Sequence, residues 1–291
     1  MTQRHATVAL PGTAGELVQG LLDGEPCLVS CPIGWFARAH VTVTTHTSWD
    51  VPDRYPKVQK ALAQLAKQLG FPPVGGRVAI HTDIPRGRGY GSSTADVAAT
   101  LYAVAQAVGH PLSPATVARL AVQVEPTDST VFPGLALFAH RTAAFWEMLG
   151  PAPPLTVIVL DPGGQVDTEA YNRRVLPEAL RPLAAYHREA FQLLFEGLVR
   201  QDWETVGQAA TLSARVHQRI LPNPLVNMAL KWMPQIHALG ICRAHSGTLV
   251  GILCDPRLID VQACLSFLRA HVPTYVRVRL FPLVDGGAHS F

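Results

Sequence analysis

Residues 85–95 read PRGRGYGSSTA, a glycine-rich turn that runs into an alanine-rich stretch ending at Gly109. Glycines allow a backbone to approach a ligand closely, and the serines that follow begin a predicted helix. A helix start offers free N–H groups and a positive dipole end, which together bind phosphate. Hydroxyl groups in the first turn can ligate magnesium, cap the helix or contact a phosphate oxygen. The segment predicts a nucleotide phosphate loop formed by Pro85, Gly87, Gly89, Gly91, Ser92, Ser93 and Thr94.

An ordinary glycine-rich turn with a serine cap is the alternative for a lone segment of this kind. The chain has no Walker A lysine, no GxGxxG spacing and no protein-kinase catalytic loop, so the common nucleotide folds do not explain the turn. A strand is predicted just before it, at residues 76–84, and a long helix just after it. This junction is the most informative feature of the sequence.

Strands and helices are predicted in mixed order along the rest of the chain. A helix is expected over residues 55–70, the stretch PAPP at 151–154 reads as a linker, and mainly helices follow before two strands around a turn at 241–255. Mixing without regular alternation indicates an α+β fold. We expect two halves around a cleft, residues 1–150 and 151–291. The strands expected in the first third are residues 8–12, 28–34 and 35–45.

Composition narrows the functional class. Apolar residues make up 48% of the 291 positions and charged residues 15%, which argues against disorder and suits an enzyme, alone or as a homodimer. The formal charge is only +3 and the basic residues are scattered, so nucleic acid is not an expected partner. No segment resembles a signal peptide or membrane span, which predicts a cytoplasmic protein without a membrane partner. The five cysteines are predicted to be buried thiols without disulfides or zinc.

A second concentration of polar groups lies in VEPTDSTVFPG, residues 124–134. Glu125 and Asp128 are three residues apart on a predicted loop between a helix and a strand. Both carboxylates are expected to face the cleft. The alternative is that one caps a turn and the other pairs with a surface arginine.

Three segments in order resemble the motifs of the galactokinase, homoserine kinase and mevalonate kinase (GHMP) family. PRGRGYGSSTA is similar to the family's PxxxGLGSSAA motif, with Tyr90 in place of the usual leucine. PGTAGELVQG at residues 11–20 resembles the first motif, and HSGTLVGI at 245–252 resembles the third. The resemblance covers nearly the whole chain. It implies a two-lobed α+β fold, with a ribosomal-protein-like N-terminal half and a ferredoxin-like C-terminal half, and it implies an ATP cleft and magnesium.

Within this family the segments look most like the L-threonine kinases of adenosylcobalamin synthesis. This resemblance implies transfer of phosphate from ATP to the side-chain hydroxyl of L-threonine, giving L-threonine O-3-phosphate for the aminopropanol linker. Homoserine or another small alcohol stays open as acceptor, because a one-methylene difference is worth only about 1 to 3 kcal/mol in a pocket. A catalytically silent nucleotide or metabolite sensor with this fold also stays open.

The family resemblance assigns catalytic roles to the two carboxylates. It implies that Glu125 and Ser93 hold magnesium, which prefers hard oxygen ligands. It also implies that Asp128 orients or deprotonates the substrate hydroxyl, although phosphoryl transfer often needs little beyond alignment and charge neutralisation. We therefore expect Asp128, Ser93 and Glu125 to form the catalytic set.

Polar residues of the first and third motifs are the candidates for substrate binding. Glu16 and Gln19 are expected to hold the ammonium and carboxylate groups of the substrate, the alternative being turn or strand-edge residues. Ser246, Gly247 and Thr248 are expected to contact phosphate or the substrate carboxylate, the alternative being a plain hairpin turn.

The family resemblance places adenine near residues 55–57, which an ordinary helix start would explain almost as well. Arg86 and Arg88 stay outside the catalytic set, because loop arginines are more often solvated. Imidazole catalysis has little support, because the histidines show no shared spacing.

Overall fold

The computed structural model describes residues 4–44, 47–68, 70–166, 171, 175 and 177–290. Within these ranges the strands form one curled sheet whose main path runs β10-β7-β9-β8-β1-β2-β4-β3. Strand β3 pairs with β4 in parallel, and the other pairings along this path are antiparallel. The strands are β1 (Arg4–Leu22), β2 (Glu25–Thr44), β3 (Trp49–Asp50), β4 (Gly75–His81), β5 (Leu135–Phe138), β6 (Trp146–Gly150), β7 (Thr156–Asp161), β8 (Gly240–Arg243), β9 (Val250–Cys254), β10 (Arg277–Pro282) and β11 (His289–Ser290).

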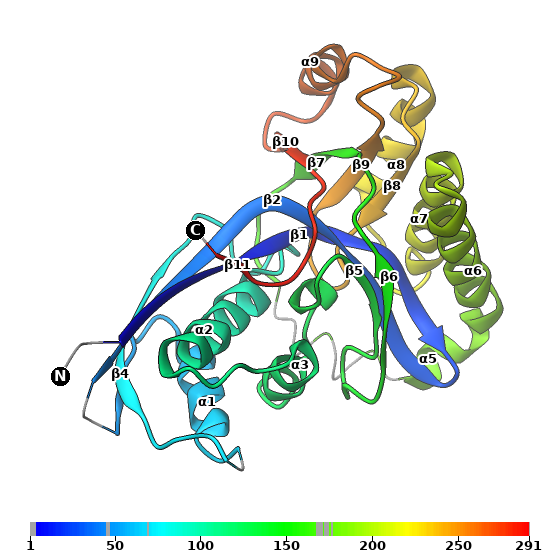
Figure 1. Ribbon diagram of the computed structural model, residues 1–291. Helices are drawn as coiled ribbons and strands as arrows, with labels where there is room; N and C mark the ends of the chain where they lie inside the picture. The colour runs from blue at the N-terminus through cyan, green and yellow to red at the C-terminus, as the bar shows by residue number, and fades with distance from the viewer. Residues whose placement is uncertain are drawn as a thin grey trace.

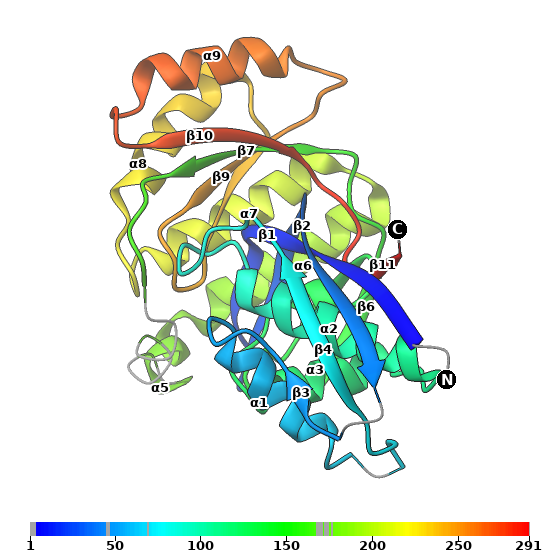
Figure 2. The same ribbon diagram turned by 90° about the vertical axis from the view of Figure 1, so that its left-hand side faces the viewer.

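The helices fall into three groups around this sheet (Figures 1 and 2). Helix α2 packs against β1 and β2 with α1 and α3 beside it, α6 and α7 pack against β1, and α8 and α9 cover the strands of the second half. The helices are α1 (Pro56–Leu65), α2 (Ser92–Val108), α3 (Pro114–Val122), α5 (Pro177–Leu180), α6 (Ala184–Arg200), α7 (Trp203–His217), α8 (Pro224–Trp232) and α9 (Val261–His271), with short 3-10 turns at Ser129–Val131, Arg181–Leu183 and Met233–Ile236.

A long two-stranded ribbon, β1 and β2, forms the backbone of the molecule. Its hairpin turn holds Asp23 and Gly24, both with positive φ (49° and 87°), which is the backbone that a tight two-residue turn requires. The pairing of β1 with β2 shifts register between Pro11 and Gly12, and it shifts once more on each side of Glu16. Bulges of this kind bend a strand and redirect its side chains. The first motif therefore lies where the ribbon bends, with Glu16 facing the pocket.

The two sequence halves share this sheet. Strand β1 pairs with β2 on one side and with β8 on the other, where Glu16 lies opposite Arg243. Apolar residues of α6 and α7, among them Phe191, Leu194 and Val206, belong to the same core as α2 and the ribbon. A second core lies between β7 to β10 and helices α8 and α9. The boundary at 150/151 stays a prediction, since the sheet and the larger core both cross it.

The expected α+β class is confirmed, and Ser92 begins α2 as predicted. The prediction of three short strands in the first third is wrong, because this region holds the two long strands β1 and β2. Bulges let these strands continue through their glycines and prolines. Helix α9 and the exposed strand β6 were not predicted from the sequence. Positions 45 and 69, which lie within a predicted strand and helix, are outside the described residues.

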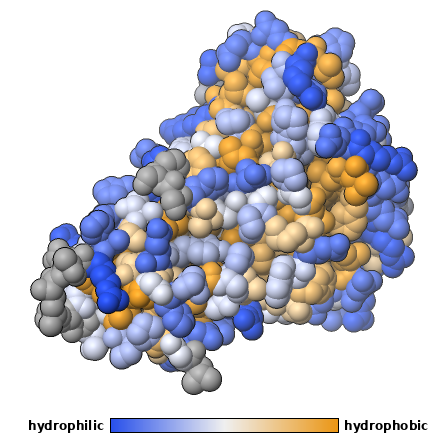
Figure 3. All heavy atoms as spheres, viewed as in Figure 1, coloured by the Kyte–Doolittle hydropathy of each residue, from blue (hydrophilic) through white to orange (hydrophobic). Residues whose placement is uncertain are grey.

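The surface of the molecule mixes apolar and polar residues. Figure 3 shows pale and orange residues across the middle of one face, among strongly hydrophilic ones. The five cysteines are buried, as predicted. Within the described part of the chain, no helix is long and apolar enough to cross a membrane.

Candidate active site

A pocket of about 520 Å³ lies where the phosphate loop, the start of α1 and the loop after α3 meet. It is lined by residues from all three family motifs. Glu16 contributes from the first motif, the glycine loop and the first turn of α2 from the second, and Ser246 from the third. Glu125 and Asp128 also line it, as expected for the two carboxylates.

The phosphate loop has the backbone that its glycines predict. Gly87, Gly89 and Gly91 have φ values of 69°, 98° and 65°, a region that side-chain-bearing residues rarely adopt. Gly91 is also the N-cap of α2, and no side chain caps it. The free N–H groups at the start of this helix therefore border the pocket, which makes it suited to an anion.

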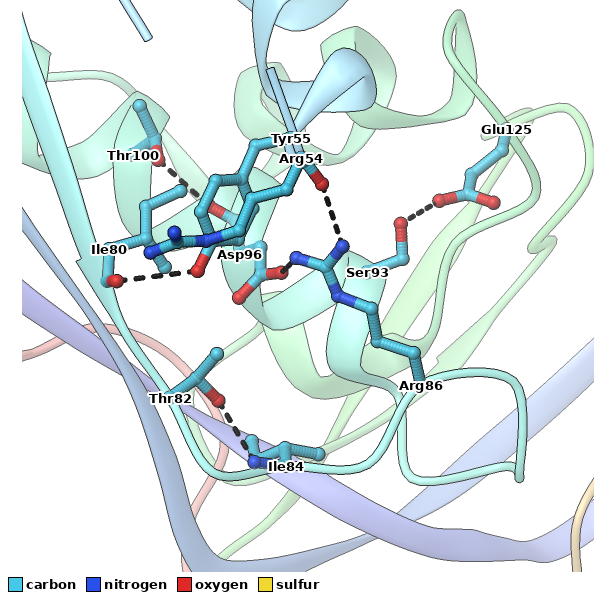
Figure 4. Close-up of polar contacts among 10 residues, drawn as sticks. All are labelled: Arg54, Tyr55, Ile80, Thr82, Ile84, Arg86, Ser93, Asp96, Thr100 and Glu125. Carbon is cyan, nitrogen blue, oxygen red and sulfur yellow. Dashed lines mark hydrogen bonds and ion pairs between the residues drawn. The ribbon is translucent and has the colours of Figure 1, made fainter. Parts of the chain in front are cut away.

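Ser93 and Glu125 lie in direct contact. The Ser93 hydroxyl donates to Glu125 Oε1, and the Lys57 ammonium donates to Glu125 Oε2. Figure 4 shows Ser93 pointing from α2 toward Glu125. The sequence placed Lys57 near adenine only and gave no sign of its contact with Glu125, since 68 residues separate them.

Asp128 lies next to the helix start. Its backbone N–H donates to Thr94 Oγ1 at 3.1 Å. Burial raises the pKa of the Asp128 carboxyl to about 6, Glu125 adds to the rise, and the Thr94 hydroxyl opposes it. A carboxylate with a pKa of about 6 is mostly ionised at neutral pH and can accept a proton.

Glu16 is the other pocket carboxyl, and it is buried. Burial and then the nearby Asp128 raise its pKa well above the usual value, while a hydrogen bond from Ser30 opposes the rise. Among the described residues, no group donates to Glu16 Oε2. A buried carboxyl with an open oxygen is suited to a cationic group of a ligand, which would restore its ionised form.

Histidines from distant parts of the chain meet beside Glu16. His140 and His245 both line the pocket, and their ring centroids lie 4.7 Å apart. His245 Nδ1 and Gln19 Oε1 lie 2.6 Å apart, so Gln19 positions this ring. Gln19 is not among the described residues that line the pocket. Burial lowers the pKa of His245 to about 3 and that of His140 well below its usual value, so both are neutral. Sequence spacing carries no signal for this cluster, because only the fold brings these residues together.

Arg86, from the glycine loop, also lines the pocket. It donates to Asp96 Oδ2 (3.4 Å) and to the carbonyl oxygen of Arg54 (2.7 Å), and its guanidinium lies 4.6 Å from the centre of the Tyr55 ring (Figure 4). Burial raises the pKa of Asp96 to about 7, although Arg86 opposes the rise. Residues 55–57, expected near adenine, line the pocket as well.

The third motif mostly contacts the backbone of the phosphate loop at Arg88. The backbone N–H of Thr248 donates to the carbonyl oxygen of Arg88 at 3.1 Å, and its hydroxyl donates to the carbonyl of Gly163 at 3.0 Å. Gly247 packs against the Arg88 carbonyl with no room for a side chain. Gly247, Thr248 and Pro85 do not line the pocket, so direct ligand contacts for them stay predictions.

Comparison with known proteins agrees with these motifs. The GHMP kinases N-terminal domain matches residues 56–135. An L-threonine kinase from Salmonella typhimurium is 36% identical over 97% of this chain and 94% of its own length. A homoserine kinase from Shouchella clausii is 29% identical over 80% of each chain.

Solved structures show the same fold. A homoserine kinase from Cytophaga hutchinsonii has a TM-score of 0.73 at 16% identity, covering 100% of this chain and 98% of that chain. A structure of MDDEF in complex with MVAPP, AMPPCP and magnesium has a TM-score of 0.71 at 18% identity, covering 100% and 99% of the two chains. By fold, motif order and identity over nearly its whole length, this chain belongs to the GHMP kinases and is a small-molecule kinase.

Proposed function

We propose that this kinase transfers the γ-phosphoryl group of ATP to the side-chain hydroxyl of L-threonine, giving L-threonine O-3-phosphate and ADP. The observation that carries the proposal is one pocket lined by two chemically distinct sets of groups. One set is the start of α2 with Ser93 and Glu125, and the other is Glu16 with His140 and His245. Asp128 lies between these groups as a pocket-lining carboxylate.

The reaction is a direct in-line displacement. The threonine oxygen forms a bond to the γ-phosphorus while the bond from that phosphorus to the oxygen of ADP breaks. The hydroxyl proton passes to the Asp128 carboxylate, whose pKa of about 6 keeps it ionised at neutral pH. The first N–H groups of α2 stabilise the negative charge on the phosphates.

Ser93 at the start of α2 and Glu125 beside it offer oxygen ligands that fit magnesium. Within the described residues, no group of three or more histidine, cysteine or acidic side chains forms a cluster for a metal. Ser93 and Glu125 offer one hydroxyl and one carboxylate, and magnesium in kinases is usually held by one or two carboxylates together with substrate phosphates. Magnesium bound there would neutralise phosphate charge. A solved structure of the same fold contains AMPPCP and magnesium, which supports magnesium as the metal that accompanies the nucleotide.

Glu16 and Leu28 of this pocket suit an amino acid substrate. The open Oε2 of Glu16 would receive the substrate ammonium group. Leu28, which lines the pocket and lies opposite Gln19 in the ribbon, offers an apolar surface to the threonine methyl group. The similarity to an L-threonine kinase over 97% of the chain supports this acceptor.

Homoserine is the second candidate acceptor, because homoserine kinases are also among the relatives. With threonine as the acceptor, the product would serve the aminopropanol linker of adenosylcobalamin.

The test is magnesium-dependent ADP release with L-threonine, L-serine, L-homoserine, mevalonate and galactose, with the product identified by phosphorus NMR. Threonine phosphate as the main product supports the proposal. Homoserine phosphate as the main product would mean that homoserine, and not threonine, is the acceptor. Nucleotide binding without turnover on any alcohol contradicts the kinase reaction.

A further inference from the structure

Asp161 ends strand β7 in the second half of the chain, and its side chain is completely buried. Its Oδ2 accepts hydrogen bonds from Arg88 Nη1 (3.0 Å), the Tyr90 hydroxyl (3.3 Å) and Arg279 Nη1 (3.3 Å). Its Oδ1 accepts from the backbone N–H of Gly163 at 2.9 Å. A buried carboxylate is stable only when such donors replace water, so these groups form one connected unit.

Two of these donors belong to the phosphate loop. Arg88 lies between two loop glycines, and Tyr90 occupies the position where the family motif has leucine. Tyr90 is buried, and its ring meets Trp35 edge-on at 5.3 Å. Burial and then Asp161 raise the pKa of the Tyr90 hydroxyl, so it remains a donor.

The loop backbone is held from the same side. The N–H of Val166, just beyond β7, donates to the carbonyl oxygen of Gly87 at 2.8 Å. The N–H groups of Thr248 and Leu249 donate to the carbonyl oxygen of Arg88 at 3.1 and 3.2 Å. The second half of the chain therefore contacts the loop by backbone bonds at two points and by the Asp161 carboxylate through two side chains.

We propose that Asp161 is a positioning residue for phosphoryl transfer: through Arg88 and Tyr90 it fixes the phosphate loop and sets the affinity for the nucleotide. The three glycines leave the loop backbone flexible by itself, and small displacements of a phosphate cradle are costly in catalysis. Asp161 does not line the pocket, so it acts only through the loop. The inference rests on the proposed placement of the triphosphate at the start of α2.

The experiment compares Asp161→Asn with Asp255→Asn in the full chain. Asp255 is a matched control, because it is a buried carboxylate of the same half that pairs with Arg257 at 2.6 Å, away from this pocket. We expect Asp161→Asn to weaken magnesium-AMPPNP binding in calorimetry about 10-fold and to lower kcat by about 10- to 100-fold. The KM for threonine should stay within about 2-fold, since Glu16 and the histidines are untouched.

The control should lower the melting temperature and leave nucleotide affinity unchanged. Tyr90→Phe, which removes one hydroxyl, should weaken nucleotide binding in the wild-type background and have no further effect in Asp161→Asn. If Asp161→Asn does not fold, Tyr90→Phe alone carries the test. Unchanged nucleotide affinity in a folded variant, or additive effects of the two changes, overturns the inference. Wild-type protein that binds no nucleotide contradicts the proposed function instead.

Discussion

The carboxyl group of Asp128 lies against the N-cap of α2: a Cβ added to Gly91 would come 2.7 Å from Asp128 Oδ2. This closeness links the residue that precedes α2, the proposed phosphate-binding helix, to the candidate base. It also explains why glycine is needed at position 91 for two reasons, a φ of 65° and a lack of space.

Gly91→Ala should lower kcat by about 100-fold, because the added methyl displaces Asp128 and strains the loop. Gly109→Ala is the matched control, since Gly109 has a φ of 69° at the other end of the same helix and a Cβ added there would meet nothing within 4 Å. Both variants should lose about 1 to 2 kcal/mol of stability in urea unfolding from the left-handed backbone, and Gly91→Ala should lose more because of the clash. Equal kcat values in the two variants would refute the steric argument.

Asp128→Asn should lower kcat by about 100- to 10,000-fold, because the amide cannot accept the hydroxyl proton. The wild-type kcat/KM should fall as the pH drops below about 6, where the carboxylate becomes protonated. The variant should lose this acid limb. If it keeps more than about a tenth of the wild-type rate, Asp128 serves alignment and not proton transfer.

Glu125→Gln should raise the magnesium concentration needed for half-maximal activity by about 10-fold or more, since it removes a charged oxygen ligand. Ser93→Ala should act in the same direction. Glu147→Gln, an exposed change on β6, is the control and should leave the magnesium titration unchanged. A magnesium requirement that is the same in Glu125→Gln and the control would place the metal elsewhere.

Glu16→Gln should raise the KM for threonine by about 10- to 100-fold, the usual value of a hydrogen bond to a charged group. The KM for ATP should not change, because the groups proposed to bind ATP are the start of α2, Ser93 and Glu125, and not Glu16. A matched substrate supplies the control: 3-hydroxybutyrate lacks the ammonium group, so wild type and variant should use it equally poorly. A different kcat/KM of wild type and Glu16→Gln on 3-hydroxybutyrate would argue against a contact between Glu16 and the ammonium group.

The buried Asp96 should make stability depend on pH. Its folded-state pKa is raised to about 7, so the folded protein holds a proton that the unfolded chain has released, and its contribution to stability declines as the pH rises from about 4 through 7. Asp96→Asn should therefore reduce the drop in melting temperature between about pH 5 and pH 8. Asp255→Asn should not, because Arg257 lowers the pKa of Asp255 and keeps it ionised across that range. A pH dependence identical to wild type in Asp96→Asn would contradict the assignment.

Local signals were enough to predict the glycine turn and the start of α2. Glycines alternate up to Gly91 and hydroxyls follow at Ser92, so both features depend on neighbouring residues. The loop carboxylates were predicted to face the cleft, and Glu125 and Asp128 do line the pocket. Helix α9 could have been found as well, because Asp260 caps it and apolar residues recur at helical spacing after it.

Other parts of the site depend on the fold alone. His140 and His245 are 105 positions apart in the sequence and adjacent in space. Asp161 looks like the end of an ordinary strand until β7 is placed beside the phosphate loop. The length of β1 was also beyond pattern reasoning, because bulges let a strand pass through residues that usually end one.

Helices α6 and α7 come after the predicted linker at residues 151–154, yet they complete the core that the first half begins. A fragment cut at residue 150 would therefore expose a broad apolar face on each piece. The two halves are not interchangeable modules. A chimera that joined the first half of this kinase to the second half of a distant relative would therefore fold only if the relative's α6 and α7 presented matching apolar faces to this core.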